Sequence, residues 1–314
     1  MTNKMNKRIK TVFGLAALFN LFVFFSPQNV FAQSINLSVT PPLTEIVIAP
    51  GKSIKQKLTI TNSGSLLTVT PKIFFFYPVD ENGNIEIDTQ REVPDWIKYD
   101  NKSFDLPGNT SREIEYNITP PSDINEEDYL LTFVFETTEG KDLLGQKQVS
   151  YKTKIASNIL VSISKDGVIN KDLKIDSFTY PKIVDSLFNR INYKVILKNK
   201  TRSFQKPNGY IYLSGFNQDK KIKLAEVNVI PQKERSIPCI DNEEIKSCGF
   251  SSMFLIGKYT QLLEFRSDDD GKVVKEVGQT YAIPFSIMAF LSLLIVLTLK
   301  GKTLIFNLWK RAKS

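Results

Sequence analysis

The chain has 314 residues, with 41 Lys and Arg against 33 Asp and Glu, a formal net charge of +8 and no histidine. The absence of imidazole excludes a Ser-His-Asp or Cys-His catalytic arrangement and removes the usual general base near neutral pH. Nine basic residues and no acidic ones lie in segments 1–32 and 300–314, so the rest carries about −1 and the charge gives no support for nucleic-acid binding.

The first segment, 1–32, has the composition of an export signal. Four basic residues precede an apolar run from Val12 to Phe25, and a polar break leads to Val30, Phe31 and Ala32. This pattern predicts a cleaved secretory signal peptide that ends at Ala32. An uncleaved anchor helix is the alternative, although the run is short for a span of roughly 20 residues.

From Ile35 onward, short strand-like segments alternate with turn signals at roughly ten-residue spacing. Glycine, asparagine and proline between them tolerate or preset turn geometry. The pattern predicts an all-β chain with two tandem immunoglobulin-like β-sandwich domains, over 33–164 and 165–280. The expected strands of the second half include Leu224 to Ile230. A tyrosine opens a late strand in each half, Tyr129 and Tyr259, either as a tyrosine corner or as a simple core aromatic.

The run Phe74 to Tyr77 is the most interesting surface candidate. Successive side chains of a strand point to opposite faces, so one pair must point away from its own core. We take Phe75 and Tyr77 as the candidate binding surface, for a partner or for glycan stacking. The alternative is that the outer face is covered by the neighbouring domain or a loop.

Acidic clusters along the chain are interpreted as turns and not as sites. The run Asp80 to Asn84 fails the spacing of an EF-hand calcium loop and indicates a hairpin turn. The runs Glu126 to Asp128 and Asp268 to Asp270 are typical of solvated loops. We therefore expect no enzyme activity, no metal site and no cofactor. A glycosidase using two carboxylates is the enzymatic alternative.

Cys239 and Cys248 enclose a short loop in the portion expected to be exported. An oxidising compartment and a hairpin-sized spacing favour a disulfide between them. A free-thiol or metal pair is the alternative, but without histidine a zinc site would need carboxylates.

Near the C-terminus, the stretch Tyr281 to Leu299 is almost continuously apolar, and five basic residues follow it. It predicts a transmembrane helix over 281–299 with a basic cytoplasmic tail over 300–314, and so an extracellular location for 33–280. A buried core helix is the alternative, but no polar face repeats at helical spacing.

This layout resembles the WxL-interacting proteins of bacterial surfaces. The residues that carry the resemblance lie mostly within 33–165: Leu37-Ser38-Val39-Thr40-Pro41, Ala49-Pro50-Gly51-Lys52, Leu58-Thr59-Ile60-Thr61-Asn62, Asp80-Glu81-Asn82-Gly83, Trp96-Ile97, Leu106-Pro107-Gly108 and Tyr116-Asn117-Ile118-Thr119-Pro120-Pro121. The resemblance implies an N-terminal domain that binds peptidoglycan and a second immunoglobulin-like domain.

The leading hypothesis is a single-pass membrane protein whose ectodomain binds cell-wall polymer or another surface protein without catalysis. Strand addition at an open sandwich edge is one route for a protein partner. The alternatives are a passive spacer or adhesin stalk, and a membrane-held assembly factor for exported proteins.

Overall fold

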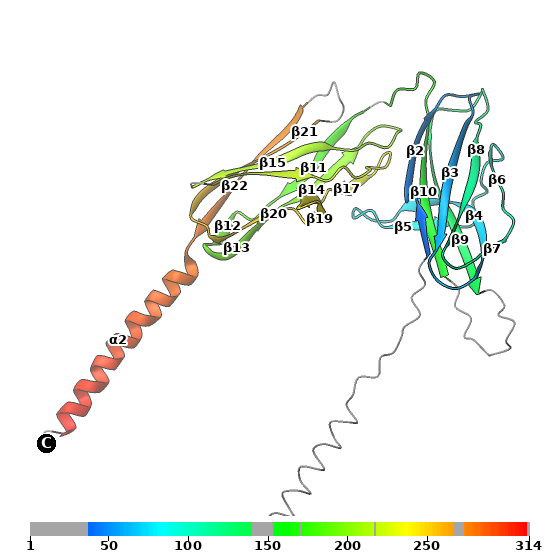
Figure 1. The fold of residues 1–314 in the computed structure, drawn as a ribbon. Coiled ribbons are helices and arrows are strands. Elements are labelled where there is room, and N and C mark those ends of the chain that lie inside the picture. The colour runs from blue at the N-terminus through cyan, green and yellow to red at the C-terminus, as the bar shows by residue number, and fades with distance from the viewer. Residues whose placement is uncertain (1–36, 140–152, 170, 217, 267–272, 313–314) are drawn as a thin grey trace, which may run out of the picture. The chain divides into compact units, whose positions relative to one another are not determined.

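The computed structural model describes residues 37–139, 153–169, 171–216, 218–266 and 273–312 (Figure 1). This part of the chain forms two immunoglobulin-like β-sandwiches in tandem, followed by one long apolar helix. The predicted all-β fold class is therefore confirmed. The expected signal peptide, 1–32, lies outside the described residues.

The first sandwich consists of two sheets. One has the order β1-β3-β8-β6, with β1 at Leu37–Thr40, β3 at Ile54–Asn62, β8 at Thr110–Ile118 and β6 at Ile97–Tyr99. The other has the order β2-β10-β9-β4-β5, with β2 at Leu43–Ile48, β10 at Thr153–Ile163, β9 at Asp128–Glu139, β4 at Leu67–Pro78 and β5 at Ile85–Asp88; β7, Phe104–Leu106, also pairs with β4. The chain changes sheets at the cis Thr40–Pro41 bond, after which β2 runs parallel to β10.

The two outer faces of this sandwich differ in chemistry. In β3, Leu58 and Ile60 are fully buried, while Lys55 and Lys57 on the opposite face form ion pairs of 2.6 Å with Glu115 and Glu113. Because these pairs are exposed, they leave this face solvated and add little stability. The outer face of the other sheet is divided: on one part Lys72 and Lys154 pair with Glu136. On the other part Phe76, Leu130 and Leu160 form an apolar row, and the candidate site is built there.

The second sandwich also has its own core. One sheet has the order β11-β14-β17, with β11 at Leu173–Thr179, β14 at Lys194–Asn199 and β17 at Glu234–Ser236. The facing sheet has the order β12-β22-β21-β15-β16-β18-β19, with β12 at Ile183–Asp185, β22 at Val273–Ile283, β21 at Gly257–Arg266, β15 at Asn208–Gly215, β16 at Gln218–Leu224, β18 at Cys239–Asp241 and β19 at Glu244–Lys246. A two-stranded ribbon joins β13, Leu187–Asn192, to β20, Gly249–Phe254.

One predicted strand of this half is wrong. The expected strand from Leu224 to Ile230 ends at Leu224, where β16 stops. The apolar residues that follow are buried individually in an irregular segment, in which Val229 is fully buried and makes an isolated bridge with Gln205. The alternation of apolar residues in this segment therefore indicates burial of their side chains, but not pairing of the segment as a strand.

Tyr129 and Tyr259 are both buried core aromatics, but their hydroxyls differ. The Tyr129 hydroxyl donates to the Glu127 carboxylate at 2.6 Å. The Tyr259 hydroxyl accepts from the backbone N–H of Ile256 at 3.4 Å. Of the two, only Tyr259 bonds to nearby backbone.

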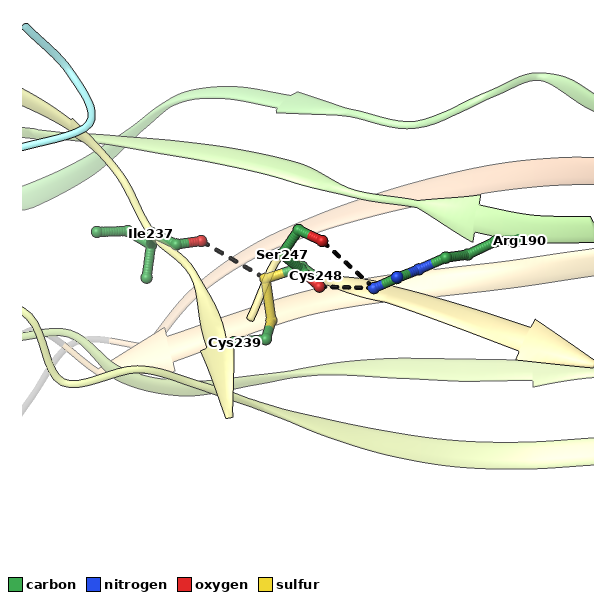
Figure 2. The surroundings of a disulfide bond; sticks show 5 residues. All are labelled: Arg190, Ile237, Cys239, Ser247 and Cys248. Carbon is green, nitrogen blue, oxygen red and sulfur yellow. Dashed lines mark hydrogen bonds between the residues drawn. A yellow bond between two sulfur atoms is a disulfide. The ribbon is translucent and has the colours of Figure 1, made fainter. Parts of the chain in front are cut away.

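The predicted disulfide is present and lies between β18 and the start of β20 (Figure 2). Cys239 and Cys248 are both buried in the core of the second sandwich. Next to them, the Arg190 guanidinium donates to the carbonyl oxygen of Ser247 at 2.7 Å, and Cys248 Sγ lies 3.5 Å from the carbonyl oxygen of Ile237. The bond thus closes the β18–β19 hairpin against the core.

The C-terminal helix α2 runs from Phe285 to Ala312 and follows β22 in the chain (Figure 1). Its window Phe285–Lys302 is long and apolar enough to cross a membrane by length and composition. The predicted start at Tyr281 is wrong, because Tyr281 to Ile283 still pair with β12 as the end of β22. Pro284 separates strand from helix, since proline has no N–H for a ladder but suits the first turn of a helix.

We expect the C239A/C248A double variant to lose about 2 to 3 kcal/mol of unfolding free energy in the second sandwich, because the bond closes a ten-residue loop in the unfolded chain. Hydrogen exchange in denaturant, followed separately for β15–β21 and for β3–β8, measures this. The first sandwich is the internal control, and equal loss of protection in both would contradict the assignment.

Candidate functional site

The sequence-predicted binding pair, Phe75 and Tyr77, does not form a common surface. Phe75 is only 4% exposed and belongs to the core of the first sandwich, so its assignment to the surface is wrong. Tyr77 is 44% exposed, and its hydroxyl is hydrogen-bonded to the Glu86 carboxylate. Phe76 points to the other face of the sheet and is buried as well. Because residues 74–77 are all aromatic, the sequence does not indicate which alternate pair faces the core.

Phe76 lies on the outer face of the sheet β2-β10-β9-β4-β5, which we call the junction face. Register places Phe76 of β4, Leu130 of β9 and Leu160 of β10 side by side across this face. Phe204 of the second sandwich packs with them in a small separate cluster. The expected alternative, that the outer aromatic face is covered by the neighbouring domain, therefore applies to Phe76.

Polar contacts surround this apolar contact. Glu45 of β2 accepts a hydrogen bond from Asn228 at 2.6 Å and forms an ion pair with Lys206 at 2.7 Å. On the other side, the Glu81 carboxylate pairs with Lys194 at 2.6 Å, and the Glu81 carbonyl oxygen accepts from the backbone N–H of Ser236 at 2.6 Å. The two sandwiches are thus joined by an apolar centre with hydrogen-bonded flanks.

The turn that carries Glu81 is a hairpin turn, as predicted. The Asp80 carboxylate accepts from the backbone N–H groups of Asn82 and Asn84 at 2.9 and 3.0 Å. The hydrogen bond from the Asn84 side chain, together with these backbone bonds, holds the Asp80 pKa below its ordinary value. Gly83 has φ +85°, and a Cβ there would lie 2.5 Å from the Arg235 guanidinium. Glycine thus lets the turn lie directly on Arg235.

A cavity of about 290 Å³ remains open beside the junction face. Its lining includes the apolar residues Leu43, Phe76, Ile85 and Leu160, and also Arg235. The Arg235 guanidinium donates to the Asn228 carbonyl oxygen at 2.5 Å, while its buried Nε has no hydrogen-bond partner. Burial lowers the pKa of Arg235. The cavity is suited to an apolar side chain with an acidic or carbonyl group beside it.

Strand β5 provides the open border of this cavity. The backbone N–H of Val79 donates to the carbonyl oxygen of Asn84 at 2.9 Å, which makes these two residues a hydrogen-bonded pair. Hydrogen-bonded and non-hydrogen-bonded pairs alternate in an antiparallel ladder. By the observed register, Ile85 and Ile87 are therefore in non-hydrogen-bonded pairs, and their backbone groups point away from β4. No described strand pairs with that edge of β5.

Exposed apolar side chains occur on both faces of this hairpin. By register, Ile85 and Ile87 share the junction face with Pro78 and Phe76, whereas Tyr77 and Val79 point to the opposite face; each of Tyr77, Val79, Ile85 and Ile87 is between 38% and 52% exposed. Edge strands in monomeric proteins are usually protected by charge, proline or a covering loop. β5 has only four residues, two of them acidic, but its outward backbone groups and exposed isoleucines still form a template for pairing with a short segment of another chain.

Asp128 is a half-buried carboxylate at the junction, where the sequence predicted a solvated acidic run; Glu126 and Glu127 of the same run are exposed. Its Oδ2 accepts from the backbone N–H of Phe204 at 2.7 Å, and its Oδ1 is buried without a hydrogen-bond partner. Burial raises the pKa of Asp128 from 3.8 to about 6, although hydrogen bonds to its carboxylate act in the opposite direction. Local sequence contains no signal for this, since the covering loop is 76 residues away.

The site consists of apolar side chains, one partly buried guanidinium and open backbone groups of β5. Within the described residues, no group of three or more His, Cys, Asp or Glu side chains could hold a metal ion. Sequence reasoning identified the hairpin but missed Glu45, Asp128 and Arg235, each of which acquires its role from a contact between the two sandwiches.

No family model and no curated protein matches the chain. Among solved structures, the YadV chaperone is similar over 78% of this chain and 100% of its own, at 10% identity and a TM-score of 0.38. The class 5 fimbriae chaperone CfaA covers 79% and 100% at 14% identity and a TM-score of 0.37. The E. coli chaperone DraB covers 80% and 99% at 16% identity and a TM-score of 0.36.

The pKa of Asp128 leads to a testable pH dependence. Folded protein keeps this proton up to about pH 6, whereas the unfolded chain releases it near 3.8, so its contribution to stability falls as pH rises between these values. We expect D128N, which stays neutral, to be more stable than the wild type at pH 7 by at most about 3 kcal/mol. The gain should shrink toward pH 4.

Denaturant unfolding at several pH values measures the difference. E136Q is a control of opposite sign: bonds from Lys154 and Lys72 lower the Glu136 pKa to about 2, so its contribution is present above 4.5 and lost as pH falls toward 2. A wild-type-minus-D128N difference that does not change with pH would contradict the burial of Asp128.

Proposed function

We propose that this protein is a membrane-held surface protein that binds an extended segment of another exported or surface protein, without catalysis. The observation that carries the proposal is the free edge of β5 beside the apolar cavity. A segment added to β5 would form main-chain hydrogen bonds with Ile85 and Ile87. Its alternate side chains would lie over the junction face, where the cavity accepts them.

The cell membrane is the proposed location. Helix α2 has an apolar window of 18 residues, about 27 Å long at the rise of an α-helix, which is close to the hydrocarbon thickness of a bilayer. The basic residues after it favour a cytoplasmic tail. The two sandwiches would then lie outside the cell.

Peptidoglycan binding, which the resemblance to WxL-interacting proteins implies, remains the competing proposal. The candidate surface for glycan stacking was the aromatic pair Phe75 and Tyr77, and burial of Phe75 leaves a single exposed ring there. Carbohydrate stacking on this strand therefore has less support than pairing with a peptide. The spacer and stalk alternatives offer no role for the open edge.

The test is a backbone substitution on the edge. I87P removes an N–H that points away from β4, and proline is tolerated on edge strands at such positions. I87A truncates the side chain but keeps the N–H, so it is the matched control. The full-length wild type and both variants, in nanodiscs, are incubated separately with proteins released from the surface of producing cells and with purified cell-wall sacculi.

We expect a surface protein to be retained by the wild type, retained more weakly by I87A and lost with I87P, at unchanged melting temperature. Equal binding of sacculi by all three proteins would replace the proposal with the polymer alternative. Retention of nothing in either arm would favour a spacer.

A further inference from the structure

The end of the second sandwich from which α2 emerges carries a group of exposed apolar side chains. Phe216, Met253, Phe254 and Ile256 are 64%, 74%, 42% and 36% exposed. We call these four residues the helix-proximal patch. Monomeric soluble proteins seldom expose large apolar side chains together, and such groups mark interaction sites.

Backbone hydrogen bonds connect this patch to the start of the helix. The Ser186 N–H donates to the Ile283 carbonyl oxygen at 3.1 Å, and the Leu255 N–H donates to the Ser186 carbonyl oxygen at 2.8 Å. Leu255 itself is fully buried in the core, which holds its segment in place while Phe254 and Ile256 on either side remain exposed. The patch is therefore held two hydrogen bonds away from the residue that ends β22.

Strand register brings Phe216 to the same end. Ser214 of β15 is opposite Thr260 of β21, and Gly257 of β21 is opposite Ala282 of β22. Phe216 directly follows the end of β15, and the Gln218 side chain donates to the Ser252 hydroxyl at 3.4 Å. Three chain segments thus meet beside the helix.

Only Pro284 separates β22 from the apolar helix. The Asp185 carboxylate accepts bonds from the backbone N–H and the hydroxyl of Ser286, which joins the first turn of α2 to the sandwich. Because the apolar window begins at Phe285, residues around Ile283 would lie at the level of the lipid headgroups. Tyr281 is exposed there, as is typical of residues at a membrane interface.

We propose that the helix-proximal patch inserts into the interface of the bilayer that α2 spans, so that the second sandwich rests on the membrane. The occupant is lipid, since the patch is continuous with the membrane-spanning segment. Exposed Lys182 and Lys258 at the same end would lie among the headgroups. This inference rests on the proposed membrane span and adds a second contact with lipid.

The test uses cysteine-attached fluorophores. The native cysteines are joined and buried, so only an introduced thiol reacts. F216C and M253C probe the patch. I245C is the matched control, because Ile245 is also 64% exposed but lies at the other end of the sheet, where β19 pairs with β18 and β18 with Lys223 of β16. L294C, within α2, reports the span itself.

Each labelled full-length protein is placed in nanodiscs of phosphatidylcholine and phosphatidylglycerol that contain nitroxide lipids, with the nitroxide either high or deep in the acyl chain. We expect the deep nitroxide to quench L294C. We expect the high nitroxide to quench F216C and M253C at least about twofold more than I245C.

The outcomes separate the two proposals. Quenching of L294C without preferential quenching of F216C and M253C would overturn the patch insertion and leave the span intact. If those labels respond only when a protein partner is added, the patch is a protein interface and the inference is also wrong. An unquenched L294C would overturn the span, and the inference with it.

Discussion

The arrangement of this protein depends on the two-sided burial of one sheet. The sheet β2-β10-β9-β4-β5 has the core of the first sandwich on one face and the apolar row of Phe76, Leu130 and Leu160 on the other. That second row would be costly in water, and it is covered by Phe204 from the next sandwich. Glu45, Glu81 and Asp128 then form hydrogen bonds or ion pairs with the second sandwich around that contact.

The same constraint explains where the sheet remains open. The second sandwich covers the centre of the junction face and contacts the hairpin tip at Glu81. It leaves the cavity open and the outer edge of β5 unpaired. The apolar side chains that pack against the second sandwich continue beyond the area that it covers, and there they can bind another apolar surface. The candidate site is thus a continuation of the contact that joins the two sandwiches.

Sequence was sufficient where a local pattern determines the outcome. Leu58, Ile60 and Tyr116 alternate with polar residues along the chain, and all three are buried. Spacing in a portion expected to be exported predicted the bond between Cys239 and Cys248. It failed where a strand is apolar on both faces, because the run Phe74 to Tyr77 looks the same in either orientation. It failed again at Asp128, whose partial burial involves Ser203 and Phe204, far away in the chain. The boundary of α2 could have been placed better, since Pro284 is visible in the sequence.

The short connection between β22 and α2 has a mechanical consequence. Strand β12 runs parallel to β22 at the point where the chain leaves the second sandwich, and β21 pairs with β22 over its whole length. A pull between a partner held by the first sandwich and a helix held in the membrane would load these ladders along the strand direction. Hydrogen bonds loaded in shear share the force and break together, whereas an unzipped hairpin loses them one at a time. The strand pairing of β12, β21 and β22 next to α2 is therefore suited to resist a pulling force between the second sandwich and the helix.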